Sequence, residues 1–354
     1  MPSPWPPRSP CLPLACLLAC LLFVLQTANV GAAPPVRGRV LGSKPVSRAK
    51  PAGKEHPRQR LPRGTRRLSS RAAAKSLQQI RKAQPTRSLA ELRPGLTRYR
   101  SIAARIDQLA SVHSSAVKTS QLGDAFGLRI AKVELVGSKP VPGKRLRVLI
   151  IGGVHAGTEV VGTEAATRFV EMAAKNPSLR NQFDITVIPM LNPSGMVLGT
   201  RKNAGGEDIN RSFQAGAWTH ESRLLRDFAQ RETFDLVIDM HGAGNERTNG
   251  FFILRGGNDG GMSNRVLSSM KTSSLNDVAG AGGKPAQAGP YRFDRLGSAT
   301  SETAGTLKAF FASRGARYSY TFEAPTRMNG EAQVRGMVKL LRSTLHNVRK
   351  HGDW

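Results

Sequence analysis

The stretch that decides the fold class is 147–159, which reads RVLIIGGVHAGTE. Its nearly continuous aliphatic run is typical of a strand buried on both faces of a sheet. A helical pattern over 160–174 follows, and further buried strands are expected at 183–190 and 234–240. Because strands alternate with helices, the sequence predicts an α/β fold: a single domain with a mixed, largely parallel central sheet flanked by helices.

Other elements are expected on both sides of this centre. Two strands at 117–122 and 128–136 precede it, and helices are expected at 221–231 and 330–346. The stretch 256–289 is rich in glycine and has no periodic pattern, so we expect loops there that could wall a pocket.

Polar side chains follow the three buried strands at the points where the strands end. His155 comes after the first, Asn192 after the second and His241 after the third. In such sheets, sites form at the carboxyl ends of the strands. Glu159 lies within one turn of His155, so these two could bind one ion together, and His241 could complete the set. Three protein ligands that leave one open position are typical of a catalytic zinc site.

Three polar motifs lie between the histidines: NPSG at 192–195, RKN at 201–203 and DINR at 208–211. Two arginines and an asparagine this close together suit the capture of a carboxylate, because a guanidinium can form two parallel hydrogen bonds to it. The alternative for Arg201 and Arg211 is ordinary solvated charge. Together with the histidines, the motifs indicate an enzyme that holds a peptide by its free C-terminal carboxylate. Such an enzyme would cut beside that carboxylate with metal-activated water.

In order and spacing, these motifs resemble the zinc metallocarboxypeptidase family, the carboxypeptidase A-like, funnel-type peptidases. The resemblance runs from about residue 88 to the C-terminus. It implies a metalloprotease that hydrolyses C-terminal bonds of peptides or of peptidoglycan stem peptides. The stretches that carry it are GGVH at 152–155, NPSG at 192–195, RKN at 201–203, DINR at 208–211, DMH at 239–241 and YSYTFE at 318–323.

The resemblance also implies the metal site. His155, Glu159 and His241 would bind one zinc ion per chain. Asp208 would accept a hydrogen bond from His155 and set its tautomer.

Substrate roles follow from the same resemblance. Asn210 and Arg211 would hold the terminal carboxylate of the substrate, and Arg201 would polarise the scissile carbonyl. Glu323 would act as general base to the attacking water and then as acid to the leaving amine. Tyr291 is the candidate for the family's tyrosine that caps the substrate.

The chain departs from the family's pattern in three places. Three residues separate His155 from Glu159 where the family has two, so we expect the extra residue to form a bulge that still presents Glu159. Tyr291 lies further from Glu323 along the chain than the family's spacing. Gly242 follows His241 where relatives carry polar or aromatic substrate contacts, which leaves the subsites open.

Specificity for the terminal side chain depends on one of two neighbouring residues upstream of Gly315. Leu307 would suit an apolar terminal residue. Lys308 would suit an acidic terminal residue, or the carboxylates of a stem peptide. The sequence does not choose between them.

Residues 1–32 have the composition of a secretory signal peptide. Arg8 is its lone positive charge, an apolar run spans 12–28, and small residues at 30–32 offer a cleavage site. The alternative is a membrane anchor, but the run is slightly short for one. We therefore expect a secreted or periplasmic bacterial protein without a transmembrane span in its mature form.

The three cysteines of the chain, Cys11, Cys16 and Cys20, all lie in this signal. The mature chain could therefore hold a metal only through histidine and carboxylate, without thiolates or disulfides.

The formal net charge of +29 is unevenly spread, since residues 34–100 hold 19 Lys and Arg against two acidic residues. We expect the segment 33–87 to be disordered, with a catalytic domain over 88–354. Residues 34–100 would bind a polyanionic envelope polymer or form a solvated linker. They lack a groove-reading motif, so no specific nucleic acid is expected as a partner.

Two other functions stay open. An N-acyl amino acid deacylase of the aspartoacylase or succinylglutamate desuccinylase type would keep the zinc and the arginine pair, and would cut N-acyl amino acids. An inactive peptide-binding envelope protein would bind no stoichiometric zinc. The longer spacing from His155 to Glu159 favours this last function, and the retention of Glu323 counts against it.

Overall fold

The computed structural model describes residues 69–139, 145–243, 250–271, 291–296, 304–325 and 328–352. All of them belong to one compact unit. The expected signal peptide at 1–32 lies outside the described residues. In the part that is described, no helix is both long and apolar enough to cross a membrane.

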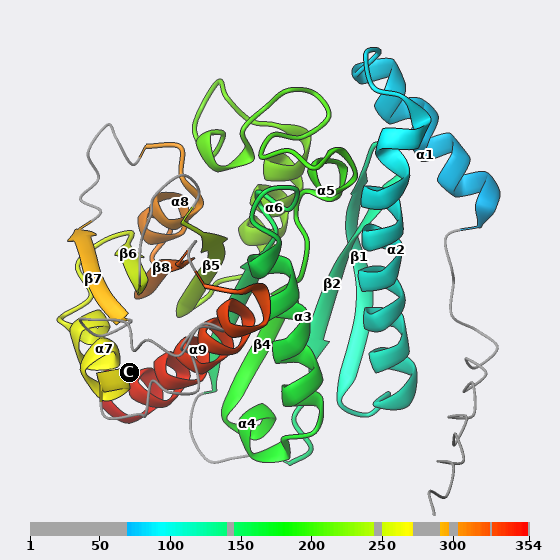
Figure 1. Ribbon diagram of the computed structural model, residues 1–354. Helices are drawn as coiled ribbons and strands as arrows, with labels where there is room; N and C mark the ends of the chain where they lie inside the picture. The colour runs from blue at the N-terminus through cyan, green and yellow to red at the C-terminus, as the bar shows by residue number, and fades with distance from the viewer. Residues whose placement is uncertain are drawn as a thin grey trace, which may run out of the picture. The chain divides into compact units, whose positions relative to one another are not determined.

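Eight strands of the described residues form one mixed sheet in the order β1-β2-β4-β3-β5-β8-β6-β7 (Figure 1). Strands β4, β3, β5 and β8 run parallel at its centre. The antiparallel pair β1 and β2 joins β4 on one side, and β6 joins β8 antiparallel on the other. This confirms the predicted α/β fold. The strands are β1 (Val117–Ala125), β2 (Leu128–Leu135), β3 (Leu146–Gly152), β4 (Phe183–Ile188), β5 (Leu236–Gly242), β6 (Phe251–Arg255), β7 (Tyr291–Leu296) and β8 (Tyr318–Ala324).

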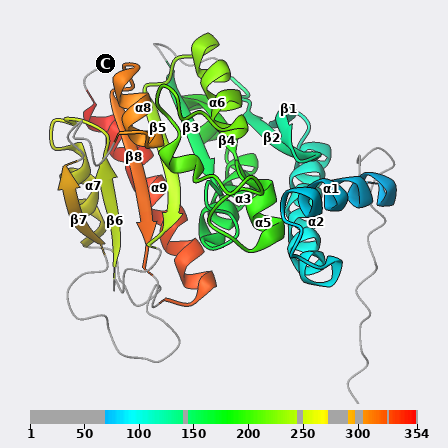
Figure 2. The ribbon, with the colours of Figure 1, turned by 90° about the horizontal axis from the view of Figure 1, so that it is seen from above.

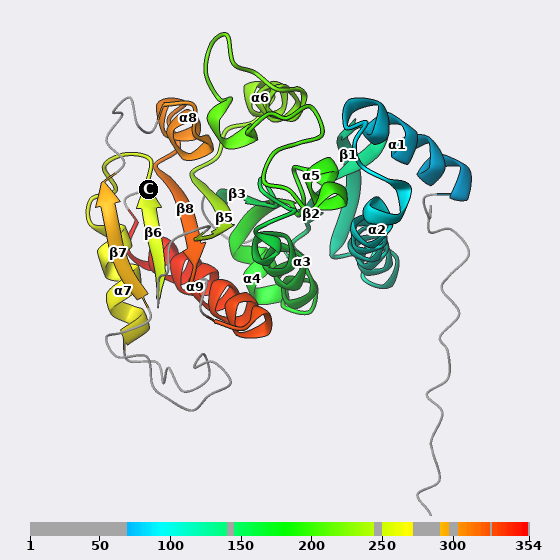
Figure 3. The same ribbon diagram turned by 45° about the horizontal axis from the view of Figure 1, so that its top comes forward.

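Helices cover both faces of the sheet (Figures 2 and 3). One apolar cluster joins α3, α7 and α9 to one face, and a second joins α6 and α8 to the other. Strand β3 serves both clusters, because its successive side chains point to opposite faces: Val148 enters the first and Leu149 the second. The helices are α1 (Ser70–Ala83), α2 (Leu89–Val112), α3 (Val160–Ala174), α4 (Pro177–Gln182), α5 (Pro193–Leu198), the 3-10 turn η1 (Ile209–Arg211), α6 (His220–Arg231), α7 (Met262–Lys271), α8 (Leu307–Ser313) and α9 (Gly330–His351).

The structure differs from the sequence prediction at the start of the folded domain. The segment 33–87 was predicted to be disordered, yet α1 lies within it and its Ile80 is fully buried in an apolar cluster with Leu128 and Met196. The Ser76 hydroxyl also donates to the carbonyl of Gly127, at 2.9 Å. The apolar stripe of α1 is narrow, and it was not recognised because the segment was judged by its basic composition. The described structure begins at Ser69, and residues 33–68 lie outside it.

The glycine-rich stretch 256–289 is also more regular than predicted. Helix α7 occupies its first part and buries Met262, Val266 and Met270 at helical spacing against α9 and the sheet. Residues 272–289 lie outside the described residues.

Candidate functional site

Three neighbouring parallel strands bring the predicted residues to one edge of the sheet. Strands β3, β5 and β8 are adjacent, and His241 on β5 is aligned with Glu323 on β8. Since aligned residues on neighbouring strands face the same side of a sheet, Glu323 lies beside His241. His155 follows β3 at the same edge.

A tight turn after β3 accommodates the extra residue between His155 and Glu159. The amide of Glu159 donates to the carbonyl of His155 at 2.9 Å, so the two residues stand one helical turn apart and face the same way. Gly153 has a φ of 65°, which only glycine adopts easily. A Cβ at Gly157 would come within 2.2 Å of the carbonyl oxygen of Gly195, so only glycine permits this close approach. The turn therefore presents Glu159 at the start of α3.

Asn192 ties this turn to the arginine-bearing loop. Its Nδ2 donates to the carbonyl oxygens of Val154 and Arg201, at 3.1 and 3.3 Å. Its Oδ1 accepts from the amide of Gly195 and caps α5. The NPSG motif thus has a positioning role: it fixes the loops that carry His155 and Arg201 relative to each other.

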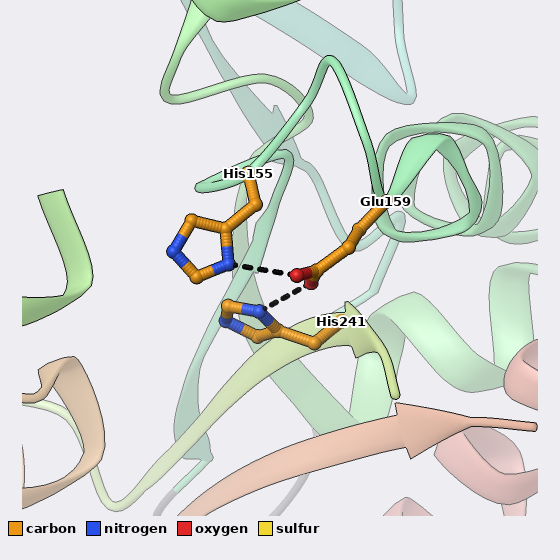
Figure 4. A group of neighbouring side chains, drawn as sticks. All are labelled: His155, Glu159 and His241. Carbon is orange, nitrogen blue, oxygen red and sulfur yellow. Dashed lines mark hydrogen bonds and ion pairs between the residues drawn. The ribbon is translucent and has the colours of Figure 1, made fainter. Parts of the chain in front are cut away.

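The three expected metal ligands converge (Figure 4). His155 Nδ1 lies 3.1 Å from Glu159 Oε1, and His241 Nδ1 lies 2.8 Å from Glu159 Oε2. The potential ligand atoms all lie within 4.8 Å of one another, and all three residues are buried. Two imidazoles and one carboxylate around one point form a donor set that fits zinc, and three protein ligands are the number found in catalytic zinc sites.

Both histidines are oriented by a second carboxylate. His155 Nε2 lies 2.9 Å from Asp208 Oδ1, and His241 Nε2 lies 2.7 Å from Asp239 Oδ2. With each Nε2 donating to a carboxylate, each Nδ1 is left as the metal-facing atom; these partners assign the tautomers. The role of Asp239 was missed from the sequence. The signal was its spacing, since residues two apart on a strand share a face.

The charges of this group favour a bound cation. Burial acts to raise the pKa of Glu159, but His241 and His155 outweigh it and bring that pKa below its usual range. Burial likewise acts to raise the pKa of Asp208, but His155 and Arg201 lower it overall. For His241, burial acts to lower the pKa, while Asp239 and Glu159 together raise it well above its usual value. Ionised carboxylates therefore surround the point where the three ligand atoms meet.

Arg201 contacts the acidic residues directly. Its Nη1 donates to Glu159 Oε1 at 2.9 Å and its Nε to Asp208 Oδ2 at 3.0 Å. The sequence predicted an action on the scissile carbonyl only. The structure adds that the guanidinium is hydrogen-bonded to the carboxylates of Glu159 and Asp208, while 40 % of the Arg201 side chain stays exposed.

The pair expected to bind a carboxylate lies on η1, directly after Asp208. Asn210 receives a hydrogen bond from the amide of Leu307 on its Oδ1, at 2.9 Å, and its Nδ2 is the atom that could donate to a carboxylate. Arg211 is exposed, and its Nη1 donates to the carbonyl of Asn210. Asp208 Oδ1 also accepts from the amide of Asn210, at 3.0 Å. Asp208 therefore contacts both the pair Asn210 and Arg211 and the three expected metal ligands, called the metal group below, so it is an anchor that the two share.

The structure places the remaining candidates differently. Leu307 is fully buried in the apolar cluster that joins α8 to the sheet. Lys308, the next residue, is buried as well, and its burial lowers the pKa of its ammonium group. Tyr291 begins β7 and is aligned with Phe251, at the same end of the sheet as Glu323 but with β6 between them.

The zinc carboxypeptidase family model matches residues 102–338, which is more than half of the chain. The chain belongs to the zinc carboxypeptidase family. The family is zinc-dependent, and His155, Glu159 and His241 form the group that could hold the metal. This zinc carboxypeptidase domain is thus a hydrolase of the metallocarboxypeptidase type.

Individual relatives agree with this family. A segment is 35% identical over 92 residues to murein peptide amidase A of Escherichia coli, covering 25% of this chain and 35% of that protein. The match thus spans about a third of the relative's length. The fold is similar to that of a metallo-carboxypeptidase from Burkholderia cenocepacia, with a TM-score of 0.57 and 18% identity over 70% of this chain and 68% of that one. Carboxypeptidase A from Helicoverpa armigera gives the same TM-score and identity, over 72% and 73% of the two chains.

Asp239 supplies a test of the metal group that leaves its three ligands in place. In Asp239→Ala we expect zinc affinity to fall by about 10- to 100-fold, because the Nε2 of His241 loses the carboxylate that orients its ring. Competition with a chelator of known affinity measures the change. The half-buried Asp227, which pairs with Arg226 on α6, is the matched control, so the comparison is with Asp227→Ala. Equal zinc affinities for both alanine variants would contradict this role.

Proposed function

We propose that this zinc carboxypeptidase is an exported enzyme that removes the C-terminal residue from peptides or from cell-wall stem peptides. The observation that carries the proposal is the shared anchor Asp208. Its carboxylate contacts His155 of the metal group and the amide of Asn210, beside Arg211. A substrate held by its terminal carboxylate at Asn210 and Arg211 would have its last peptide bond next to the metal group.

Each residue then has a distinct part. Arg211 and the Nδ2 of Asn210 bind the terminal carboxylate, and Arg201 stabilises the negative charge that develops on the scissile carbonyl oxygen. Zinc, when bound, supplies a Lewis acid that polarises this carbonyl and lowers the pKa of water. Glu323 takes a proton from the attacking water and returns it to the leaving amine as the C–N bond breaks.

Two substrate classes fit this proposal. Free peptides are supported by membership of the family, and murein peptides by the partial similarity to murein peptide amidase A. A pair of peptides that differ only in a free or an amidated C-terminus tests the proposal, with a murein stem peptide as a third substrate. We expect hydrolysis of the free acids only. Equal hydrolysis of the amidated peptide would contradict carboxylate capture.

Export and envelope binding are proposed from the sequence. The signal-like composition of residues 1–32 supports export. The excess of basic residues over 34–100 supports attachment to a polyanionic envelope polymer. Part of that segment is α1 and the start of α2, so the attachment would use helical surface as well as the residues before Ser69.

Replacing Arg211 tests the carboxylate clamp. In Arg211→Met we expect KM for a free-acid peptide to rise by about 10- to 100-fold, because a charge-assisted hydrogen bond to the substrate is lost. Steady-state kinetics with the free-acid peptide measure this. Arg223 on α6, an exposed arginine bonded to the carbonyl of Trp218, is the matched control. Identical KM values for wild type and Arg211→Met would contradict the proposed role of Arg211 in binding the terminal carboxylate.

A further inference from the structure

Helix α9 carries a row of basic side chains on its outer face. These side chains recur three or four residues apart, so they lie along one side of the helix, and all of them are exposed or half-buried. We call this row the α9 stripe, and its members are Arg335, Lys339, Arg342, His346, Arg349 and Lys350. The sequence from 332 to 352 contains no acidic residue, so the acidic charge of α9 is confined to Glu331 in its first turn.

The opposite face of α9 fixes the direction in which the stripe points. Its apolar side chains, among them Met337, Leu341 and Val348, are buried in the cluster that joins α9 to the sheet between α3 and α7 (Figure 1). A Cβ at Gly336 would lie 2.2 Å from the ring of Phe251, so the helix is in close contact with β6. Because α9 cannot rotate without losing this packing, the α9 stripe is held toward solvent.

Local interactions account for only part of this positive charge. Arg335 pairs with Glu331 at 3.7 Å, and the basic residues of the last turn complement the helix dipole. Lys339 and Arg342 lie in the middle of the helix, and within the described residues no carboxylate pairs with either of them. Cations four residues apart, such as Arg335 and Lys339, also repel each other. An anion that binds from outside would relieve this repulsion.

The shape of the α9 stripe and the side chains around it favour a linear polyanion. From Arg335 to Arg349 the helix rises about 21 Å, with a basic side chain about every 5 Å. Helix α9 contains no Phe, Trp or Tyr on which nucleic-acid bases could stack. The large apolar side chains that are exposed in the described part of the chain all lie outside α9, so the stripe lacks groups that could enter a lipid bilayer.

We infer that the α9 stripe binds a linear polyol phosphate polymer, with the phosphate groups of the polymer lying along the helix. The stripe is far along the chain from residues 34–100, so it adds a second, helical contact to the envelope attachment proposed for that segment. The inference therefore deepens the proposed attachment, and it does not depend on the proposed hydrolysis.

A polymer on the α9 stripe would leave the metal group accessible. The first turn of α9 borders a cavity of about 420 Å³ that Glu159 and Gly242 also line. The stripe begins one turn later, at Arg335, and follows the helix away from that cavity. Binding of the polymer and hydrolysis of a short peptide should thus be independent of each other.

Reversing two charges in the middle of the stripe tests the inference. Fluorescence anisotropy with labelled poly(glycerol phosphate) measures binding to the full chain at several salt concentrations. In Lys339→Glu with Arg342→Glu, we expect the dissociation constant to rise by about 10-fold or more at low salt. The slope of log affinity against log salt should become shallower by about 1.4, because each lost phosphate contact removes about 0.7. Hydrolysis of a free-acid peptide should stay unchanged.

The matched control is Lys118→Glu with Arg231→Glu. It changes the net charge equally at exposed positions on β1 and α6, and it should keep the affinity of the wild type. Lys339→Gln with Arg342→Gln removes the two charges without reversing them, and should show a smaller loss of affinity. This variant carries the test if the melting temperature shows that the double reversal is unfolded.

Each remaining outcome decides one claim. Unchanged affinity and salt dependence in both stripe variants would overturn the inference and leave residues 34–100 as the attachment. An equal loss in the control would also overturn it, because only the net charge would then matter. Tighter binding of single-stranded DNA or of anionic lipid vesicles, at equal phosphate concentration, would overturn the choice of partner. Loss of polymer binding in the stripe variants of a chain that cuts no peptide would support the inference and overturn the proposed hydrolysis alone.

Discussion

Replacing Glu323 by glutamine is expected to lower kcat by about 100- to 10,000-fold while the zinc content stays the same. Glutamine keeps the size of the side chain but cannot take a proton from water or return one to the leaving amine. Glu323 is aligned with His241 on the neighbouring strand, so it lies next to the metal group without belonging to the three expected ligands. Single-turnover kinetics on zinc-loaded protein, with metal analysis of the same sample, measure both quantities.

The control for this variant is Glu331→Gln. Glu331 is an exposed glutamate at the start of α9 that pairs with Arg168, and its loss should leave kcat unchanged. If Glu323→Gln turned over as fast as Glu331→Gln, the proton transfer would have to be assigned to another group.

Removing Glu159 is expected to remove the metal itself. Its carboxylate contacts His155, His241 and Arg201 at once, and it is the one carboxylate among the three converging ligands. Without it, two imidazoles remain, which is fewer than the three protein ligands of catalytic zinc sites. In Glu159→Ala we expect zinc content to fall from about one per chain to near zero, with loss of all detectable hydrolysis.

Metal analysis after dialysis measures this effect, and circular dichroism shows whether the variant is folded. Glu171 lies further along α3 and pairs with Arg105, so Glu171→Ala is the matched control and should keep its zinc. A folded Glu159→Ala protein that still binds one zinc tightly would show that the ligand set is different.

Where local pattern and burial agree, the sequence predicted the fold well. Helix α3 has the predicted bounds, 160–174, because its apolar residues recur at helical spacing directly after a buried strand. Helix α1 was missed because the long basic segment that contains it was judged by its average composition. Only a few of its positions, such as Ala73 and Ile80, are buried, so they hardly change that average. Helix α7 was missed because glycines surround a short periodic stretch.

The candidate site was likewise predicted in part and missed in part. His155 and His241 were found because each directly follows an apolar run, and the structure brings them together with Glu159. Asp239 was overlooked because an acidic residue inside a buried strand carries no motif until its neighbour is known to be a ligand. The choice between Leu307 and Lys308 depends on the rotation of α8, which only its packing against the sheet reveals.

The central claim is that the three converging residues hold a catalytic zinc ion used to remove terminal residues. The most direct measurement is the zinc content of the purified full chain, together with mass spectrometry of a free-acid peptide before and after chelation. The account predicts about one zinc per chain, release of the terminal residue only, and loss of that release on chelation with recovery when zinc is restored. A folded chain with no stoichiometric zinc, or hydrolysis that chelation leaves unchanged, would contradict it.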